Sequence, residues 1–335
     1  MSSFQGITEA VIEASGVLLR RGSVSVDIDS SQTGLMIEVT VVREQGTGRA
    51  LLLHDHGNLA RLEKDGVLVR GEDALPDGAK GVPIRQLLAE QPIESLMDLA
   101  RTLSREDRAK LQRGFAMNME IARHGLGILP DGFAGPGSPE APLPLSHLVS
   151  AGVFARMSGE SNPVMTLAGS GNKGITLSIP VFEGGRRAGH AEERVEEALA
   201  FGCLMTSAAT WHLGTLSAIC GAANAAGIGI ASAFVFLEGG SPEQVSLAVN
   251  TMVGNLAGMI CDGAKIGCAM KTLTGVEAAF RAASMAMAGM GIPPTDGIVG
   301  KDGRASLSNL GRLAQVGMAG VDTEILRIMQ DKLRP

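Results

Sequence analysis

The chain has 335 residues, the length of one large domain or of two domains of ordinary size. Apolar residues make up 45% of the sequence and charged residues only 19%, a balance that excludes intrinsic disorder. The net charge of −6 and the scarcity of aromatic residues, nine Phe and one Trp, argue against nucleic acid as a partner.

No secretory signal is expected, because residues 1–16 lack a basic start followed by an apolar stretch and a cleavage site. Four cysteines in a chain of this length do not form a disulfide framework, so we expect a cytoplasmic protein. The segment 213–237 is long enough to cross a bilayer, but Ala, Gly and Ser dominate it and basic flanks are missing. We interpret it as a helix buried on all sides and expect no membrane partner.

The first part of the chain is predicted to form a helix followed by a small antiparallel sheet. Apolar residues at helical spacing favour a helix over residues 4–20, after which the segment 23–29 alternates between apolar and polar residues. Apolar or β-branched runs at 35–44 and 48–56 precede a hairpin signal at Asp65-Gly66. These segments predict a sheet of three or four strands.

Most of the remaining chain is predicted to be helical. Helices are expected at 84–104 and 105–124, and a Pro/Gly-rich linker is expected at 126–145. Further helices are predicted over residues 188–210, 215–237, 242–262, 267–289, 306–317 and 321–333. Ser241-Pro242 is a helix start signal. We therefore predict an α+β fold, with an α+β domain over 1–125, the linker, and a mainly helical, Gly/Ala-rich domain over 146–335.

A glycine-rich loop is predicted at residues 168–176, with the sequence AGSGNKGIT. Its backbone N–H groups can turn toward an anion, and Lys173 adds positive charge. The segment matches neither the phosphate-loop pattern nor a dinucleotide fingerprint. A purely structural turn is an equally good interpretation of these residues.

The four cysteines are candidates either for metal ligands or for core residues. Cys261 and Cys268 are seven residues apart, whereas Cys203 and Cys220 lie in separate apolar segments. Iron–sulfur clusters require thiolates, but the chain contains no Cys-x-x-Cys pair. Because free cysteine is often buried, spacing alone favours four core cysteines.

Candidates for acid–base chemistry are few. His56 ends a predicted strand, Asp262 follows Cys261, and Lys271 comes three residues after Cys268. An Asp and a Lys near apolar helix ends are costly to bury without partners. The two residues are therefore partners of each other, ligand contacts, or exposed charges.

Several long motifs together resemble one family. They are AGSGNKGITLSIPV at 168–181, LSAICGAANAAG at 216–227, GNLAGMICDGAKIGCAMK at 254–271, GIVGKD at 297–302 and SLSNL at 306–310. In this order they resemble the L-cysteine desulfidase family, which is related to the α chain of bacterial iron–sulfur L-serine dehydratases. The stretch ending His56-Gly57-Asn58 and the triplet Ala155-Arg156-Met157 are similar too. The resemblance covers nearly the whole chain.

The resemblance implies a PLP-independent lyase of amino-acid catabolism. Such an enzyme acts on L-cysteine, L-serine or a related β-substituted amino acid and releases a 2-oxo acid and ammonia. A [4Fe–4S] cluster held by three cysteines polarises the leaving group through an open iron. Cys220 and Cys261 match two family ligands, and we include Cys268 as a candidate for the third.

Further roles follow from the same resemblance. The substrate carboxylate is expected on the glycine-rich loop, at residues Ser170, Gly171, Asn172, Lys173 and Gly174. Lys271, Asp262 and His56 are the residues we would test as base or orienter.

One departure from the family pattern affects the cluster. Family members begin with a helical segment that carries a Cys-Thr-Glu-Pro motif and supplies the third ligand, whereas no Cys precedes Cys203 in this sequence. A small partner subunit could supply that thiolate, and Cys268 or Cys203 could replace it. The third explanation is a non-catalytic binding or regulatory homologue that has lost the cluster. We also expect an oligomer.

Overall fold

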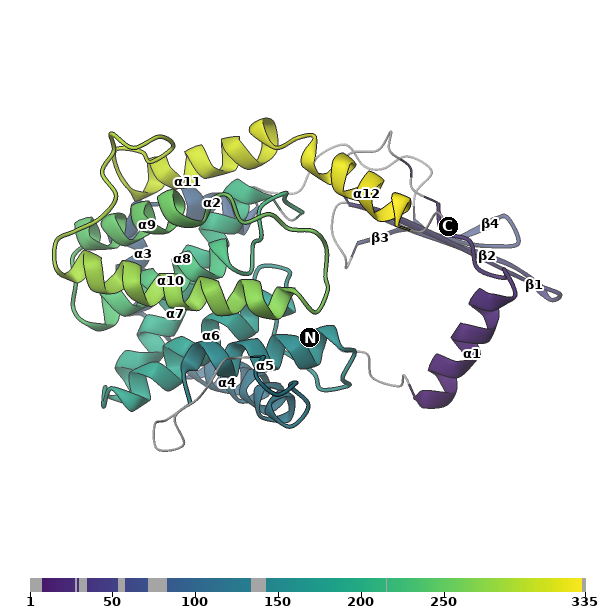
Figure 1. The fold of residues 1–335 in the computed structure, drawn as a ribbon, viewed down its shortest axis with the longest axis horizontal. Helices are drawn as coiled ribbons and strands as arrows, with labels where there is room; N and C mark the ends of the chain where they lie inside the picture. Colours follow the sequence, from purple (N-terminus) through teal and green to yellow (C-terminus); the bar gives the residue numbers. More distant parts are fainter. Residues whose placement is uncertain are drawn as a thin grey trace. The chain divides into compact units, whose positions relative to one another are not determined.

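The computed structural model describes residues 8–27, 29, 35–53, 58–71, 83–133, 143–214 and 216–332. These described residues form two compact units, which divide between Pro83 and Ile84. The smaller unit contains the sheet and one helix, and the larger unit is helical (Figure 1). The predicted α+β fold is therefore confirmed.

The smaller unit is built around a four-stranded antiparallel sheet in the order β1-β2-β3-β4. Its elements are α1 (Glu9–Arg20), β1 (Met36–Arg43), β2 (Gly46–Leu53), β3 (Leu59–Lys64) and β4 (Val67–Gly71). The hairpin signal at Asp65-Gly66 is confirmed, since both residues take positive φ values, 51° and 76°, between β3 and β4. The alternating segment 23–29 adds no strand in its described residues.

The larger unit is a bundle of helices. These are α2 (Ile84–Glu90), α3 (Ile93–Ala100), α4 (Arg105–Leu126), α5 (Leu145–Met157), α6 (Gly171–Arg187), α7 (Glu192–Leu213), α8 (Asn224–Leu237), α9 (Pro242–Leu256), α10 (Cys268–Met287), α11 (Gly303–Arg312) and α12 (Val321–Asp331), with a π-helical turn at Leu313–Gly317 after α11. The start signal at Ser241-Pro242 is confirmed, because the Ser241 side chain caps α9 and Pro242 is its first residue.

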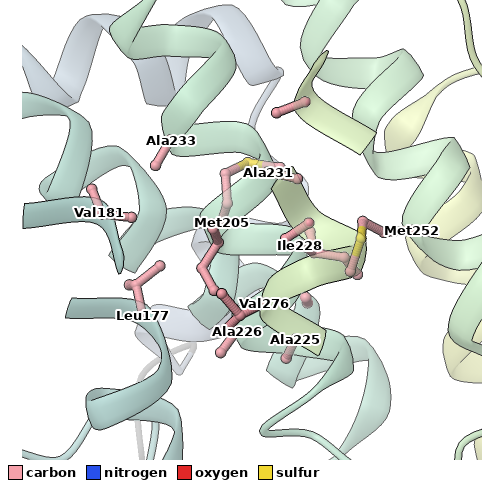
Figure 2. Packing of buried hydrophobic residues seen from close by; sticks show 14 of the residues in the cluster. Leu177, Val181, Met205, Ala225, Ala226, Ile228, Ala231, Ala233, Met252 and Val276 are labelled. Carbon is pink, nitrogen blue, oxygen red and sulfur yellow. The ribbon is translucent and has the colours of Figure 1, made fainter. Parts of the chain in front are cut away.

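Helix α8 forms the centre of the core and packs against α6, α7, α9 and α10. Figure 2 shows Ile228 and Ala231 of α8 among Leu177 of α6, Met205 of α7 and Met252 of α9. Small side chains along α8 let these neighbours approach closely, as the glycine and alanine content predicts. No helix in the described part of the chain is long and apolar enough to span a membrane.

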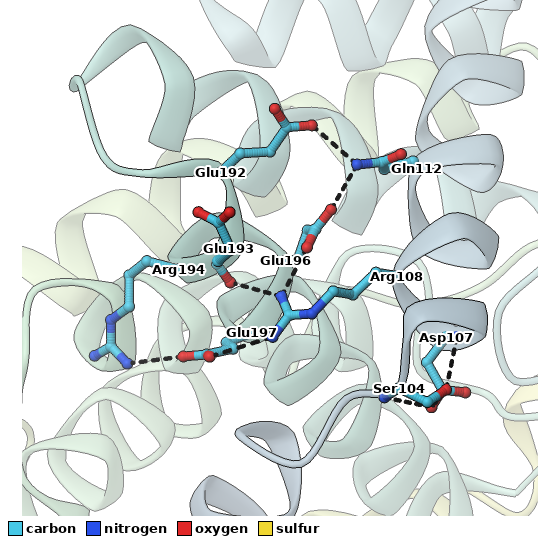
Figure 3. A network of polar contacts seen from close by, with 9 residues as sticks. All are labelled: Ser104, Asp107, Arg108, Gln112, Glu192, Glu193, Arg194, Glu196 and Glu197. Atoms are coloured by element: carbon cyan, nitrogen blue, oxygen red, sulfur yellow. Dashed lines mark hydrogen bonds and ion pairs between the residues drawn. The ribbon is translucent and has the colours of Figure 1, made fainter.

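Helix α4 follows α2 and α3 in the chain and packs on this core. It begins with a capping box between Ser104 and Asp107 and packs along α5 and α6. Toward α7 it forms a polar network, in which Arg108 binds Glu196 at 2.7 Å and Gln112 binds the same carboxylate at 2.6 Å (Figure 3).

The two compact units divide near residue 84, and the linker expected at 126–145 does not coincide with that division.

Candidate functional site

The first turn of α6 and the start of α8 lie together at one end of the bundle, and α10 packs against the start of α8. Gly221, just before α8, lies so close to Lys173 of α6 that a Cβ on the glycine would be 2.9 Å from Cε. Gly275 of α10 lies equally close to the backbone of Ala223. Because helix N-termini present unpaired N–H groups and partial positive charge, this end of the bundle favours an anion.

The glycine-rich segment differs from the predicted loop. Only Leu167–Ser170 forms a turn, closed by a bridge between its two end residues, with positive φ at Ala168 and Gly169. Residues 171–176 already belong to α6, because the Ser170 hydroxyl accepts a hydrogen bond from the Lys173 N–H at 3.4 Å and caps the helix. The prediction of a loop over 168–176 is therefore wrong beyond Ser170, and the N–H groups at this site are those of a helix start.

A buried amide holds the strand-like segment before this turn. The Asn118 side chain of α4 accepts a hydrogen bond from the Met165 N–H at 2.9 Å and donates one to the Met165 carbonyl at 3.3 Å. The Met165 carbonyl comes so close to Gly174 that a Cβ there would be 1.9 Å away. Gly174 is therefore needed for packing, and its predicted role as a substrate contact stays a prediction.

Lys173 is the most enclosed cation of the site, with 5% of its surface exposed. Its Nζ donates one long hydrogen bond, to the Ala168 carbonyl at 3.4 Å. Burial lowers the pKa of Lys173 to about 8, and the positive charge of Arg85 adds to this shift. Negative charge on Cys220 and Cys261 would act in the opposite direction. The Lys173 side chain lies against Gly221, the neighbour of Cys220.

Arg156 is a second cation in contact with this helix start. Its Nη1 donates to the Asn172 Oδ1 at 3.1 Å, and its Nε would be 2.5 Å from a Cβ on Gly171. Burial lowers the pKa of Arg156, while the nearby Cys268 thiol acts against that shift. Arg156 therefore lies between the first turn of α6 and the start of α10.

Two site residues were not predicted from the sequence, Arg156 and Arg85. The motif around Arg156 pointed to the family without giving this residue a role. Arg85 of α2 lies beside the turn, with Nη2 3.7 Å from the position that a Cβ on Gly169 would take. No sequence signal identifies Arg85, because it is a single charge in a short helix far from the glycine-rich segment.

Three of the four cysteines lie near one another. The segments of Cys220 and Cys261 are joined by a bridge between Ile219 and Ile260, and the Cys261 N–H donates to the Ala218 carbonyl at 2.7 Å. Burial raises the pKa of Cys220, which is 4% exposed, and negative charge on Cys261 or Cys268 would add to that shift.

Cys268 opens α10, and its Sγ accepts a hydrogen bond from the Lys265 N–H at 3.5 Å. Within the described residues, no three His, Cys, Asp or Glu side chains are placed to hold a metal ion together. The metal-ligand assignment of Cys220, Cys261 and Cys268 stays a prediction.

Cys203 lies apart from this group, on α7. It lines a cavity of about 180 Å³ whose wall also includes Leu177 and Leu199. Burial raises the pKa of Cys203 to about 12, so this thiol has the character of a core residue.

Asp262 and Lys271 form an ion pair, and Lys271 also donates to the Ile260 carbonyl at 3.0 Å. The hydrogen bond from Lys271 lowers the pKa of Asp262. Burial works to lower the pKa of Lys271, but the hydrogen bond and charge of Asp262 outweigh it and leave that pKa raised. Both groups are therefore charged at neutral pH. His56, the third acid–base candidate, lies outside the described residues.

Comparison with known proteins places this arrangement in a family. The chain is 34% identical to a UPF0597 protein of Geobacter sulfurreducens over 340 residues, which cover 99% of this chain and 79% of that relative. It is 36% identical to a UPF0597 protein of Oleidesulfovibrio alaskensis over 350 residues, covering 98% and 78% of the two chains. No solved structure matches the chain. Residues 79–327, which contain every described site residue above, match the serine dehydratase alpha chain model, and the chain belongs to that family.

Proposed function

We propose that this chain is a lyase, or the subunit of a lyase, that eliminates the β-substituent of L-cysteine, L-serine or a related amino acid. Membership of the serine dehydratase alpha-chain family supports a lyase-like role. The observation that carries the finer proposal is the position of Lys173, a buried ammonium group at a helix start beside Cys220 and Cys261. A carboxylate site next to a pair of thiols is the arrangement that this reaction requires.

The substrate carboxylate binds at the first turn of α6. The N–H groups of that turn and the Lys173 ammonium group are donors to an anion, and a buried ammonium group without a negative partner is costly. Arg156 holds the Asn172 side chain at 3.1 Å and so fixes the turn from the side of α5. These contacts orient the amino acid with its Cβ toward the cysteines.

The described cysteines suit two positions of an iron–sulfur cluster. Cys220 and Cys261 lie on bridged segments, and we propose that the third thiolate comes from Cys268 or from a small partner subunit. Bound there, a [4Fe–4S] cluster would act as a Lewis acid toward the leaving group.

The reaction balances without a further oxidant or reductant. The α-proton passes to a base, and the Cβ–S or Cβ–O bond breaks with its electron pair leaving on the substituent. The resulting enamine tautomerises to an imine, and water releases the 2-oxo acid and ammonia. We propose that the ion pair of Asp262 and Lys271 takes part in these proton transfers, because it lies between the segments of Cys261 and Cys268. His56 remains the other candidate for the base.

An anaerobic reconstitution tests the proposal. The purified chain is treated with iron and sulfide, its visible absorption spectrum is recorded, and release of 2-oxo acid from L-cysteine and L-serine is measured. We expect Cys220→Ser and Cys261→Ser to lose both the absorption and the activity, and Cys203→Ser, the matched control, to keep both.

Two results would count against the proposal. Full activity in Cys220→Ser and Cys261→Ser would remove the cysteines from the reaction. Carboxylate binding without absorption or turnover, with and without a partner subunit, would favour the non-catalytic binding homologue, in which the anion site persists and the chemistry is lost.

A further inference from the structure

We infer that the site takes a ligand with two carboxylates, the second of which is bound by Arg85. The inference rests on the proposed function for the first carboxylate, at Lys173 and the start of α6. It goes beyond that function by naming the substrate class, an amino acid whose side chain carries its own carboxylate.

The first step is that two cations meet at one turn without an acid between them. Arg85 lies beside Gly169, and Lys173 donates to the carbonyl of the preceding residue, Ala168. In the part of the chain that the structure describes, neither cation forms an ion pair. Other cations of this unit do, as Arg108 does with Glu196 and Arg187 with Glu183.

The second step is energetic. Two like charges close together repel, and the repulsion grows when one of them is taken out of water, as Lys173 is. The charge of Arg85 lowers the pKa of Lys173, in the same direction as burial. Packing needs neither charge at this turn, so a bound anion is what relieves the repulsion.

The third step separates two positions for acidic groups. Lys173 is enclosed beside Gly221, where a ligand reaches the helix start and the thiols. Arg85 is half-buried and lies beside Gly169, an exposed residue of the turn. One carboxylate of the ligand contacts Lys173 in the enclosed position. A ligand that extends toward Gly169 brings its second carboxylate to the guanidinium group of Arg85, which binds a carboxylate through two parallel hydrogen bonds.

Binding of carboxylates of matched length tests the inference on the full chain without any turnover. The dissociation constants of succinate and glutarate are compared with those of butyrate and valerate by titration calorimetry at low ionic strength. We expect one dicarboxylate to bind at least about ten-fold more tightly than the monocarboxylate of equal length, the gain of a charge-assisted pair of hydrogen bonds. Arg85→Gln should abolish this advantage and leave the monocarboxylate affinity within about two-fold.

Three further variants make the result specific. Arg85→Lys keeps the positive charge but loses the planar guanidinium group, so it should keep part of the tighter binding of the dicarboxylate. Arg281→Gln removes an exposed charge about 20 Å along α10 from Cys268 and should change neither affinity. Lys173→Gln should weaken both classes of ligand. Circular dichroism and the unfolding temperature establish that each variant is folded.

The possible failures are distinguishable. Equal affinities for succinate and butyrate, together with binding that depends on Lys173, would overturn this inference and leave the proposed function intact. A loss of both affinities in Arg85→Gln to the same extent would also overturn it, since Arg85 would then serve the first carboxylate. Absence of binding for every carboxylate would overturn the inference together with the carboxylate site of the proposed function.

Discussion

Arg156 and Gly171 are in such close contact that a Cβ at the glycine would overlap the guanidinium group. The guanidinium Nε would lie 2.5 Å from a Cβ at position 171, and Cγ2 of Val164 would lie 2.8 Å from it. The contact presses the charged side chain of α5 onto the first residue of α6, where its Nη1 reaches Asn172. The position of this cation is therefore set by the absence of a side chain.

Gly171→Ala is expected to displace the Arg156 side chain and to weaken carboxylate binding. The added methyl group overpacks the contact, and we expect a loss of roughly 1–3 kcal/mol in the free energy of unfolding. The measurements are a denaturant titration and the dissociation constant of butyrate.

The control for this substitution is a double-mutant cycle with Arg156→Ala. Removing the arginine relieves most of the clash, so the effects of the two substitutions should be clearly less than additive. Strictly additive losses would show that Gly171 and Arg156 act independently.

Local signals in the sequence were sufficient for the elements whose ends they mark. Asp65-Gly66 predicted a hairpin and Ser241-Pro242 a helix start, because in both cases backbone geometry depends on neighbouring residues alone. The helix predicted from residue 215 begins only at Asn224. Residues before it pair with the Cys261 segment through Ile219 and Ile260, a contact between distant parts of the chain that no local pattern reveals.

The candidate site likewise contains residues that the sequence predicted and residues that only the folded structure reveals. Residue types and the family resemblance pointed to Lys173, Cys220 and Cys261, which the structure brings together. The turn beyond Ser170 was misassigned because its glycines suggested a loop, whereas the Ser170 cap starts a helix there. Arg85 could not be predicted, since its contact with Gly169 depends on how α2 packs.

The polar network between α4 and α7 should contribute to stability. Glu196 is 3% exposed and receives hydrogen bonds from Arg108 and Gln112. Arg108→Ala leaves this carboxylate enclosed with one partner fewer, and we expect a loss of about 2 kcal/mol in the free energy of unfolding. Arg327→Ala is the matched control, because Arg327 pairs with Glu324 on an exposed surface and should cost at most about 1 kcal/mol. Equal losses in the two variants, measured by denaturant titration, would contradict a special role for the network.

Cys203 should resist alkylation in the folded protein. Its pKa is raised to about 12 by burial, so at pH 8.5 only about one thiol in three thousand is in the reactive thiolate form. Treatment with iodoacetamide at that pH followed by mass spectrometry should leave Cys203 unmodified in the native chain and modify it in urea. Rapid native labelling of Cys203 would mean that the cavity beside it opens widely to solvent.

Carboxylate binding at Lys173 should depend on pH with a midpoint near 8. The pKa of Lys173 is lowered from 10.5 to about 8 by burial and by Arg85, so the ammonium form that binds an anion is complete at pH 6 and half lost near pH 8. The dissociation constant of butyrate should therefore be constant below about pH 7 and rise about ten-fold for each unit above pH 8. Lys173→Arg, whose charge persists, should bind butyrate with little pH dependence up to pH 10.

The same shift has a second, independent consequence for the stability of the free protein. The unfolded chain holds its lysine proton up to the ordinary pKa of 10.5, whereas the folded chain releases it near 8. Between these values the unfolded state binds more protons, so the Lys173 contribution to the free energy of unfolding should increase as pH rises from about 8 to about 10.5. Saturating butyrate restores the positive charge and should reduce this increase. A comparison of unfolding free energies for the wild type and Lys173→Met across that range isolates the contribution, and parallel curves would show that Lys173 titrates at its ordinary pKa.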